Sequence, residues 1–256
     1  MVDKTHRKYA KRKPHKKPFP LARVIFVLAL IGVTCFGIYA MDALDKSLFK
    51  TTKVIVNPTG SDDSDGVHGN ETTQSDTPWY LTLVNRNNPI PQNYAITLTR
   101  VPGGELVDER IYQPLMDMLD AAKAQGLDPI VVAGYRTQQK QQSLYDEKIE
   151  SYRNQGYSEN EATRLAGQWV ALPGTSEHQL GLAVDINGAT YDIYQWLQEN
   201  SYQYGFIFRY PKDKTDITGT AQEVWHYRYV GVEAATEIYK QGLCLEEYLA
   251  NLSDES

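Results

Sequence analysis

The sequence SEHQLGLAVD, at residues 176–185, decides the fold of this 256-residue chain. Its second half alternates large and small side chains, which is the period of a β-strand. Ala183 and Asp185 would lie on one face of that strand, and the opposite face would carry three large apolar side chains, Leu182, Val184 and Ile186. A carboxylate whose only neighbour on its face is an alanine points into a space left open for a ligand.

Histidines are the second signal. The chain has five, and only two of them lie in the part that looks folded. His178 precedes the strand, and Gly181 allows the chain to turn between them. His226 lies about forty residues further on, in the motif EVWH at residues 223–226. Two imidazoles and a carboxylate are a common ligand set for catalytic zinc, with water in the fourth position. We therefore expect His178, Asp185 and His226 to bind zinc.

Glu223 is the further carboxylate that such a site needs. It lies three residues before His226 and could not easily bind the same metal, but it could accept a proton from the metal's water. Taken alone, His178 could equally be a satisfied surface histidine, Asp185 a charge at a strand edge and Glu223 an exposed residue in a turn. The pairing of the two motifs favours a metal site over these structural alternatives.

The N-terminal part of the chain predicts a membrane anchor. Residues 1–23 carry nine basic residues against one acidic residue, and residues 24–41 carry no charge. Eighteen helical residues span ~27 Å, close to the ~30 Å hydrocarbon core of a bilayer. A basic flank stays on the cytoplasmic side, so the remainder would lie outside. A cleaved signal peptide is the alternative, but its apolar region is usually shorter and no small-x-small cleavage site lies near Ala40.

Composition divides the remainder into a linker and one domain. Residues 42–78 are polar and acidic, offer little apolar surface to bury, and are predicted to be a flexible linker. The folded domain would span residues 79–251, enough for a single core. From residue 77 onwards, 24 acidic and 14 basic residues give a net charge of −10. An acidic domain without a basic stripe argues against nucleic acid as a partner.

Apolar spacing and turn signals predict both strands and helices, without the regular alternation of a doubly wound sheet. We expect strands at residues 81–84, 129–133, 182–186 and 206–208. We expect helices near residues 111–126, 138–153 and 192–204, a single last helix after Gly231, and a helix opened by the capping box Ser158-x-x-Glu161. The fold class is therefore predicted to be α+β, as a single compact domain behind one N-terminal transmembrane helix.

The two motifs, Ser-x-His-x-x-Gly-x-Ala-x-Asp and Glu-x-x-His, resemble those of the zinc D-alanyl-D-alanine carboxypeptidases of the VanY type. Other stretches are similar to that family in the same order, including LVN at 83–85, GYRT at 134–137 and YGF at 204–206. The resemblance covers about residues 79–250. It implies a small central antiparallel sheet flanked by helices, as in the DD-peptidases and the signalling domain of hedgehog proteins.

The resemblance also implies roles for individual residues. Glu223 would be the general base and then the proton donor to the leaving D-alanine. Arg136 matches the arginine of the family, whose planar fork suits a carboxylate or a tetrahedral oxyanion. Ser176 and Gln141 match positions that help to hold the end of the peptide.

The implied function is a zinc-dependent D,D-carboxypeptidase in which a zinc-bound water removes the C-terminal D-alanine from a peptidoglycan stem peptide. An L,D-carboxypeptidase acting on tetrapeptide stems uses the same chemistry. A D,D-dipeptidase is disfavoured by the anchor. The alternative from another class is a non-catalytic, zinc-containing module that binds cell-wall peptide, but such a module has no need for both Glu223 and Arg136. The expected location is the cell membrane of a Gram-positive bacterium, with the N-terminus cytoplasmic and the catalytic domain extracellular.

Overall fold

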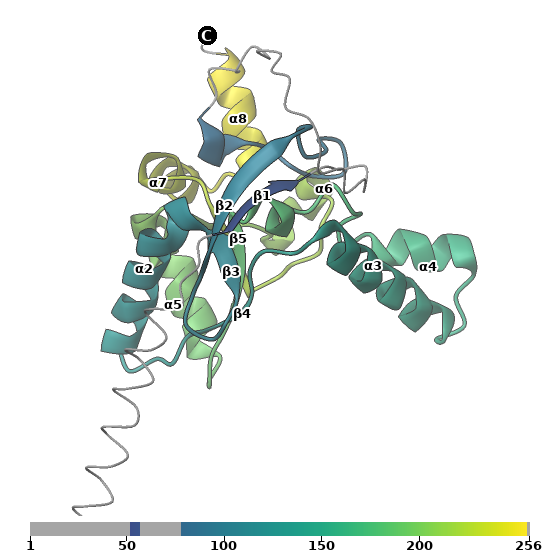
Figure 1. Cartoon of the computed structure of the whole chain (residues 1–256), viewed down its shortest axis with the longest axis horizontal. Helices are drawn as coiled ribbons and strands as arrows, with labels where there is room; N and C mark the ends of the chain where they lie inside the picture. Colours follow the sequence, from purple (N-terminus) through teal and green to yellow (C-terminus); the bar gives the residue numbers. More distant parts are fainter. Residues whose placement is uncertain (1–51, 57–77, 255–256) are drawn as a thin grey trace, which may run out of the picture. The chain divides into compact units, whose positions relative to one another are not determined.

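The computed structural model of the chain describes residues 52–56 and 78–254, all within one compact unit that begins at Lys50 (Figure 1). The strands in these ranges are β1 (Thr52–Val56), β2 (Tyr94–Arg100), β3 (Leu106–Asp108), β4 (Ile130–Ala133), β5 (Ala183–Asn187), β6 (Phe206–Phe208) and β7 (His226–Tyr229). The α-helices are α2 (Tyr112–Ala124), α3 (Gln138–Arg153), α4 (Glu159–Ala166), α5 (Asp192–Asn200), α6 (Thr215–Thr218), α7 (Val232–Gln241) and α8 (Leu245–Asp254). Short 3₁₀ segments include η1 (Trp79–Leu81), η3 (Glu177–Leu180) and η4 (Ser201–Tyr204).

The architecture confirms the α+β prediction, with two small antiparallel sheets and helices packed around them. None of the helices in the described ranges is long and apolar enough to cross a membrane. The predicted basic tail at residues 1–23 and the predicted span at residues 24–41 lie outside the described residues.

The larger sheet has the strand order β4-β5-β7-β6, and every neighbouring pair is antiparallel. The register pairs Asp185 of β5 with His226 of β7 and with Ala133 of β4. Strand β7 was not among the predicted strands, although its pairing with β5 brings the two sequence motifs together. The sheet therefore joins residues that are about forty positions apart.

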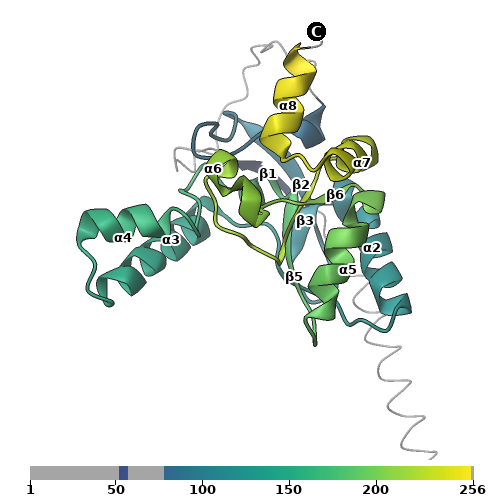
Figure 2. The same cartoon turned by 180° about the vertical axis from the view of Figure 1, so that it is seen from behind.

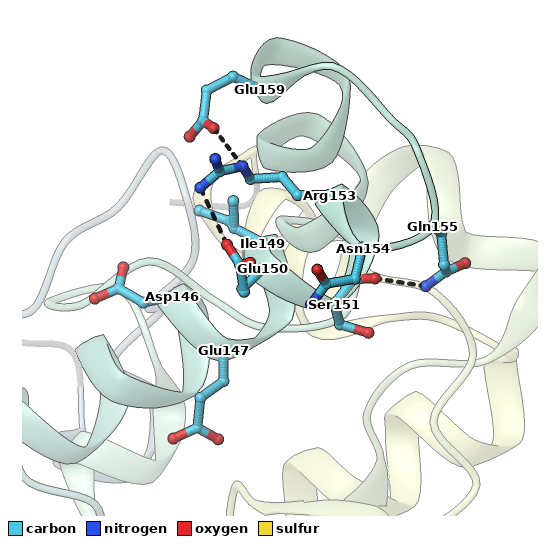
Figure 3. A pocket seen from close by; sticks show the side chains of 9 residues that line it. All are labelled: Asp146, Glu147, Ile149, Glu150, Ser151, Arg153, Asn154, Gln155 and Glu159. Carbon is cyan, nitrogen blue, oxygen red and sulfur yellow. Dashed lines mark hydrogen bonds and ion pairs between the residues drawn. The ribbon is translucent and has the colours of Figure 1, made fainter.

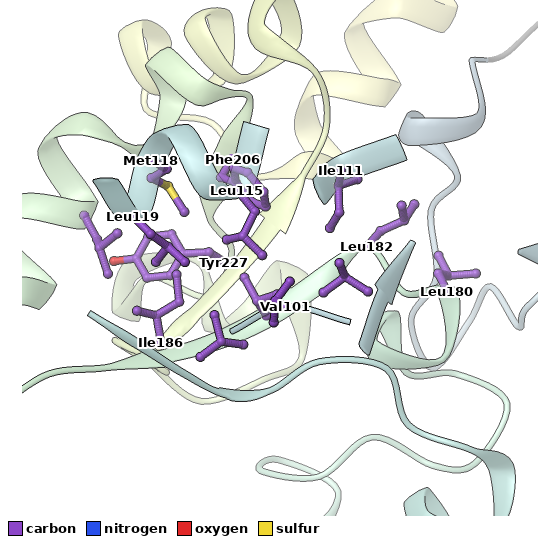
Figure 4. Close-up of a cluster of buried hydrophobic side chains, with 14 of the residues drawn as sticks. Val101, Ile111, Leu115, Met118, Leu119, Leu180, Leu182, Ile186, Phe206 and Tyr227 are labelled. Atoms are coloured by element: carbon purple, nitrogen blue, oxygen red, sulfur yellow. The ribbon is translucent and has the colours of Figure 1, made fainter. Parts of the chain in front are cut away.

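The apolar face of this sheet holds the main core (Figure 4). Leu182, Val184 and Ile186 are fully buried there, as the alternation at residues 182–186 predicted. They contribute to one cluster with apolar side chains of α2 and α5, which include Leu115, Met118, Leu119, Ile193 and Leu197. Both helices lie side by side against the sheet when it is seen from either side (Figures 1 and 2). One face of β5 is thus committed to packing.

The smaller sheet, β1-β2-β3, corrects the predicted linker. Residues 52–56 form β1, which pairs with β2 from Thr52 opposite Leu98 to Val56 opposite Tyr94. The acidic run at residues 61–66 dominated the composition of residues 42–78 and concealed this short β-branched stretch. Strands are stabilised by pairing with a neighbour. The rest of the predicted linker within residues 57–77 lies outside the described residues.

Three other local predictions need correction. The helix expected at residues 192–204 is α5 only as far as Asn200, and η4 continues it to Tyr204. Residues 81–84 were expected to form a strand, but Leu81 and Thr82 donate backbone hydrogen bonds to the carbonyls of Pro78 and Trp79, 2.8 and 3.4 Å away, and so begin in a 3₁₀ turn. The single last helix is two helices, α7 and α8. Gly242 adopts a left-handed conformation, with φ of 65°, and ends α7.

The predictions for α3 and α4 are confirmed. Helix α3 spans residues 138–153, and the Ser158 hydroxyl accepts a hydrogen bond from the Glu161 amide at the start of α4. These two helices pack against each other, and in both views the pair lies to one side of the sheets (Figures 1 and 2).

Candidate metal centre

Three of the predicted residues converge on one buried point. His178 from η3, Asp185 from β5 and His226 from β7 each offer one ligand atom, and these atoms lie within 4.8 Å of one another. The Asp185 Oδ1 atom is 3.3 Å from His178 Nε2 and 3.0 Å from His226 Nδ1. The two imidazole rings meet edge to face, with centroids 4.8 Å apart. Two nitrogens and one oxygen therefore point toward a common centre.

Backbone contacts place His178. Its Nδ1 atom is 2.8 Å from the carbonyl oxygen of Gly134, so Nδ1 carries the proton and Nε2 is left for the centre. Gly134 has no room for a side chain, because a Cβ there would lie 2.2 Å from the carbonyl oxygen of Leu106. Gly181 ends η3 with a left-handed φ of 69° and turns the chain into β5, as the sequence predicted.

His226 is oriented the opposite way round. Its Nδ1 atom faces Asp185, and its Nε2 atom lies 3.4 Å from Glu177 Oε2. Burial opposes the charged imidazolium, but hydrogen bonds to Asp185 and Glu177 outweigh it and raise the pKa of His226 to about 9 in the metal-free protein. A bound cation would compete with the proton on His226 Nδ1.

Glu177 is the residue that sequence reasoning missed. It is buried beside the centre, and although burial disfavours its charge, Arg209 and Arg228 hold the pKa of this carboxyl well below its usual range. Its sequence position next to His178 was a weak signal. The arginines that stabilise it are 32 and 51 positions away (209 − 177 and 228 − 177).

Glu223 lies next to the three ligand atoms without being one of them. Its Oε2 atom is 3.7 Å from His226 Nδ1, and its side chain is buried. Burial raises the pKa of Glu223 to about 7; His226 opposes this rise and the Asp185 carboxylate adds to it. A carboxyl group with a pKa near neutrality can both accept and donate a proton.

Arg136 reaches the centre from the end of β4. Its guanidinium nitrogen lies 2.7 Å from Asp185 Oδ2, and the side chain remains partly exposed. Ser176 is buried immediately before η3. Gln141, in the first turn of α3, donates to the Ala171 carbonyl at 2.8 Å, while its Oε1 atom is buried without a hydrogen-bond partner among the described residues. No hydrogen bond or ion pair joins either Ser176 or Gln141 to the three metal-ligand residues in the part of the chain described.

A concavity elsewhere contains none of these residues. It lies at the far end of α3 and the start of α4, where Arg153 extends between Glu150 and Glu159, and two other acidic side chains, Asp146 and Glu147, lie further along α3 (Figure 3). Arg153 forms ion pairs with Glu150 and Glu159 at 3.0 and 3.1 Å. These pairs are solvated surface contacts.

The fold and the centre define a class. A buried pair of histidines with one aspartate, beside an unliganded glutamate, is the arrangement of a mononuclear zinc hydrolase. The family model for VanY, D-alanyl-D-alanine carboxypeptidase, matches residues 104–232, and the chain belongs to that family.

Individual relatives agree. The D-alanyl-D-alanine carboxypeptidase of Enterococcus faecalis is 58% identical over 176 residues, which span 67% of this chain and 66% of that protein. A crystal structure of the vancomycin resistance D,D-pentapeptidase VanY in complex with Zn(II) is 58% identical, with a TM-score of 0.66, and covers 67% of this chain and 99% of that one. VanYB in complex with D-alanine-D-alanine is 57% identical, with a TM-score of 0.66, and covers 68% and 98%.

Proposed function

We propose that this protein is a zinc-dependent D,D-carboxypeptidase that removes the C-terminal D-alanine from peptidoglycan stem peptides. The observation that carries the proposal is the convergence of His178, Asp185 and His226 with Glu223 beside them. The relatives solved with Zn(II) and with D-alanine-D-alanine, at 58% and 57% identity, support both the metal and the substrate class.

The donor set fits zinc. Two imidazole nitrogens and one carboxylate oxygen suit this borderline-soft cation, and three protein ligands leave a position open. His178 is already held in the tautomer that leaves Nε2 available. His178, Asp185 and His226 would hold the ion. When bound, zinc acidifies a water molecule and polarises the scissile carbonyl group.

Glu223 would handle the protons of the reaction. Its carboxylate lies beside the ligand atoms, so it can accept a proton from the attacking water. The same carboxyl group would then donate that proton to the amine of the leaving D-alanine. Its buried setting, which raises the pKa of the carboxyl group, favours a group that can take up and return a proton.

Arg136 would bind the negative charge of the substrate. The guanidinium group has five donors, and the contact with Asp185 leaves others available on a partly exposed side chain. These can bind the terminal carboxylate or stabilise the oxyanion that develops during attack. We also propose that Ser176 and Gln141 help to hold the end of the peptide. The Oε1 atom of Gln141 has no hydrogen-bond partner among the described residues, which supports a role in accepting from a substrate amide.

The alternatives are weaker. An L,D-carboxypeptidase would use the same residues, but the 57% identical relative solved with D-alanine-D-alanine favours the D,D specificity. A zinc-containing binding module would not require a proton-handling carboxyl group, yet Glu223 is buried at the centre with a raised pKa.

We further propose that the protein is anchored by residues 24–41 in the membrane of a Gram-positive bacterium, with residues 1–23 in the cytoplasm and the catalytic domain outside. The uncharged span behind a strongly basic tail supports this orientation. Because β1 begins at Thr52, residues 42–51 would join the span to the domain. Digestion of intact cells with an added protease should remove the domain and leave the basic tail protected, whereas a protected domain would contradict the orientation.

The decisive experiment for the activity uses the zinc-loaded protein with two substrates. We would incubate it with a stem pentapeptide ending in D-alanyl-D-alanine and with the tetrapeptide, and follow the products by mass. Loss of one alanine from the pentapeptide alone, abolished in Glu223→Gln, is the expected result. Cleavage of the tetrapeptide alone would assign the L,D specificity, and cleavage of neither peptide by zinc-loaded protein would overturn the enzymatic function.

A further inference from the structure

Glu177 contacts three charged or polar groups in the interior of the domain. Its Oε1 atom lies 2.8 Å from Arg209 Nε and 3.1 Å from an Arg228 nitrogen, and its Oε2 atom lies 3.4 Å from His226 Nε2. All four side chains are almost completely buried. A carboxylate against two guanidinium groups is ionised, and an ionised carboxylate can only accept hydrogen bonds.

The two arginines are themselves fixed. Arg209 donates to both carboxylate oxygens of Glu246 on α8, at 2.7 and 2.8 Å. Arg228 donates to the backbone carbonyls of Tyr80, Thr82 and Tyr229, at 2.9 to 3.1 Å. These contacts come from η1 and the residue that follows it, from β7 and from α8. The position of Glu177 is therefore set by several elements of the fold.

The two histidines of the centre are held through opposite ring nitrogens. His178 gives its Nδ1 proton to the Gly134 carbonyl and presents Nε2. His226 has a carboxylate at each ring nitrogen, with Asp185 Oδ1 3.0 Å from Nδ1 and Glu177 Oε2 3.4 Å from Nε2. A cation held by Asp185 would replace the proton on Nδ1, and Glu177 would then be the acceptor that keeps the remaining proton on Nε2. Without a fixed acceptor at Nε2, the neutral ring could carry its proton on either nitrogen.

We propose that Glu177 is a positioning residue that fixes the tautomer and the ring orientation of His226 for metal binding. The inference rests on the proposed zinc site. Carboxylates that accept from the far nitrogen of a ligating histidine raise its basicity as a ligand, and their loss typically weakens metal binding about 10- to 100-fold. Glu177 would act through His226 without touching substrate.

The test must separate this role from the charge balance that Glu177 gives to the arginines. Glu177→Gln and Glu246→Gln are comparable changes, because each neutralises a carboxylate that binds Arg209 and only the first touches His226. We would purify the full chain of each variant in detergent. Zinc affinity would be measured by competition with a chelator, and thermal unfolding would be measured on the metal-free protein.

Both variants should unfold at lower temperature than the wild type. Glu177→Gln should bind zinc about 10- to 100-fold more weakly, whereas Glu246→Gln should bind it with nearly the wild-type affinity. Equal zinc affinities in the two folded variants would overturn the positioning role. A wild-type protein that binds no zinc would instead overturn the proposed function, and the inference with it.

A second measurement needs no variant and decides the question if Glu177→Gln does not fold. Selective ¹⁵N labelling of histidine in the zinc-loaded wild-type protein reports which ring nitrogen carries hydrogen. His226 should show a protonated Nε2 and His178 a protonated Nδ1. A protonated Nδ1 on His226 would show that the ring does not use the Glu177 contact, and would overturn the proposal.

Discussion

Strand β5 has five residues, and alternate residues point to its two faces. The two faces have different roles. On one face, Val184 and Ile186 are buried in a core that also contains side chains of α2, α5, β6 and β7. On the other face, Asp185 contacts three groups through individual atoms, namely Arg136, His178 and His226. Both faces are buried, so burial alone does not distinguish them.

The difference lies in how the free energy is distributed. Apolar contacts are weak, numerous and non-directional. A cavity on the apolar face therefore lowers the unfolding free energy but leaves the side chains of the polar face in place. Each contact on the polar face joins two named atoms, and an unpaired partner would be left buried without compensation. Changes on the apolar face should therefore lower stability, and changes on the polar face should lower activity.

The largest expected effect is that of Glu223→Gln. The amide has the shape of the carboxyl group but cannot accept the proton from the attacking water, so kcat should fall about 10²- to 10⁴-fold. The unfolding free energy of the metal-free protein should stay close to that of the wild type, because no ion pair with an arginine or lysine is lost. Kinetics on the stem pentapeptide and chemical denaturation measure the two quantities. A large loss of stability with normal kcat would contradict the comparison.

Leu182→Ala is the counterpart on the apolar face. Leu182 is fully buried, and its truncation should lower the unfolding free energy by about 2–5 kcal/mol. In the folded fraction, zinc affinity and kcat should remain near the wild-type values, since the polar face is unchanged. Leu252→Ala, at an exposed position on α8, is the matched control and should change stability little. Loss of zinc binding in folded Leu182→Ala would show that the two faces are coupled.

Arg136→Lys should have a smaller effect on the polar face. Lysine keeps the positive charge near Asp185 but lacks the planar fork that can bind a second carboxylate, so kcat/KM should fall about 10- to 100-fold. Arg164→Lys, an exposed change on α4, serves as the control. If the arginine binds the terminal carboxylate, a pentapeptide amidated at its C-terminus should show little difference between wild type and Arg136→Lys. An equal loss for the amidated peptide would assign Arg136 to the oxyanion instead.

Sequence patterns predicted what depends on neighbouring residues. The alternation at residues 182–186 gave both faces of β5, and the Gly181 turn and the bounds of α3 were also correct. Asp185 and His226 come together because β5 and β7 pair, although β7 itself was not predicted, and the turn at Gly181 places His178 beside them. The chemistry of the donor set compensated for the missing strand.

What the sequence could not show depends on pairing across the chain. β1 becomes a strand by pairing with β2, about forty residues away, and its own segment is embedded in polar sequence. The role of Glu177 is visible only when Arg209 and Arg228 are placed beside it. The residues that bind the metal form a recognisable pattern in the sequence. Residues that orient them, such as Glu177, are found only from interatomic distances in the folded structure.

The smallest expected effect concerns pH and tests whether the polar contacts differ in kind from the apolar ones. Burial opposes the charge of Glu246, but Arg209 outweighs it, with a further hydrogen bond from Asn85, so its pKa is lowered. A lowered folded-state pKa means that the ion pair contributes stability above the unfolded pKa of ~4.3 and loses it as the pH falls through the lower folded value.

Denaturation of zinc-free protein at pH 7, 4 and 3 should show Glu246→Gln less stable than wild type at pH 7, by about 1 kcal/mol or more. That difference should shrink on acidification, because the wild type loses the pair as well. The difference between Leu182→Ala and wild type should stay constant over the same range, since no proton is involved. A Glu246→Gln difference that is equally constant would show that the Glu246 carboxylate acts through packing alone, and the contrast between the two faces would then not extend to the ion pairs behind the metal centre.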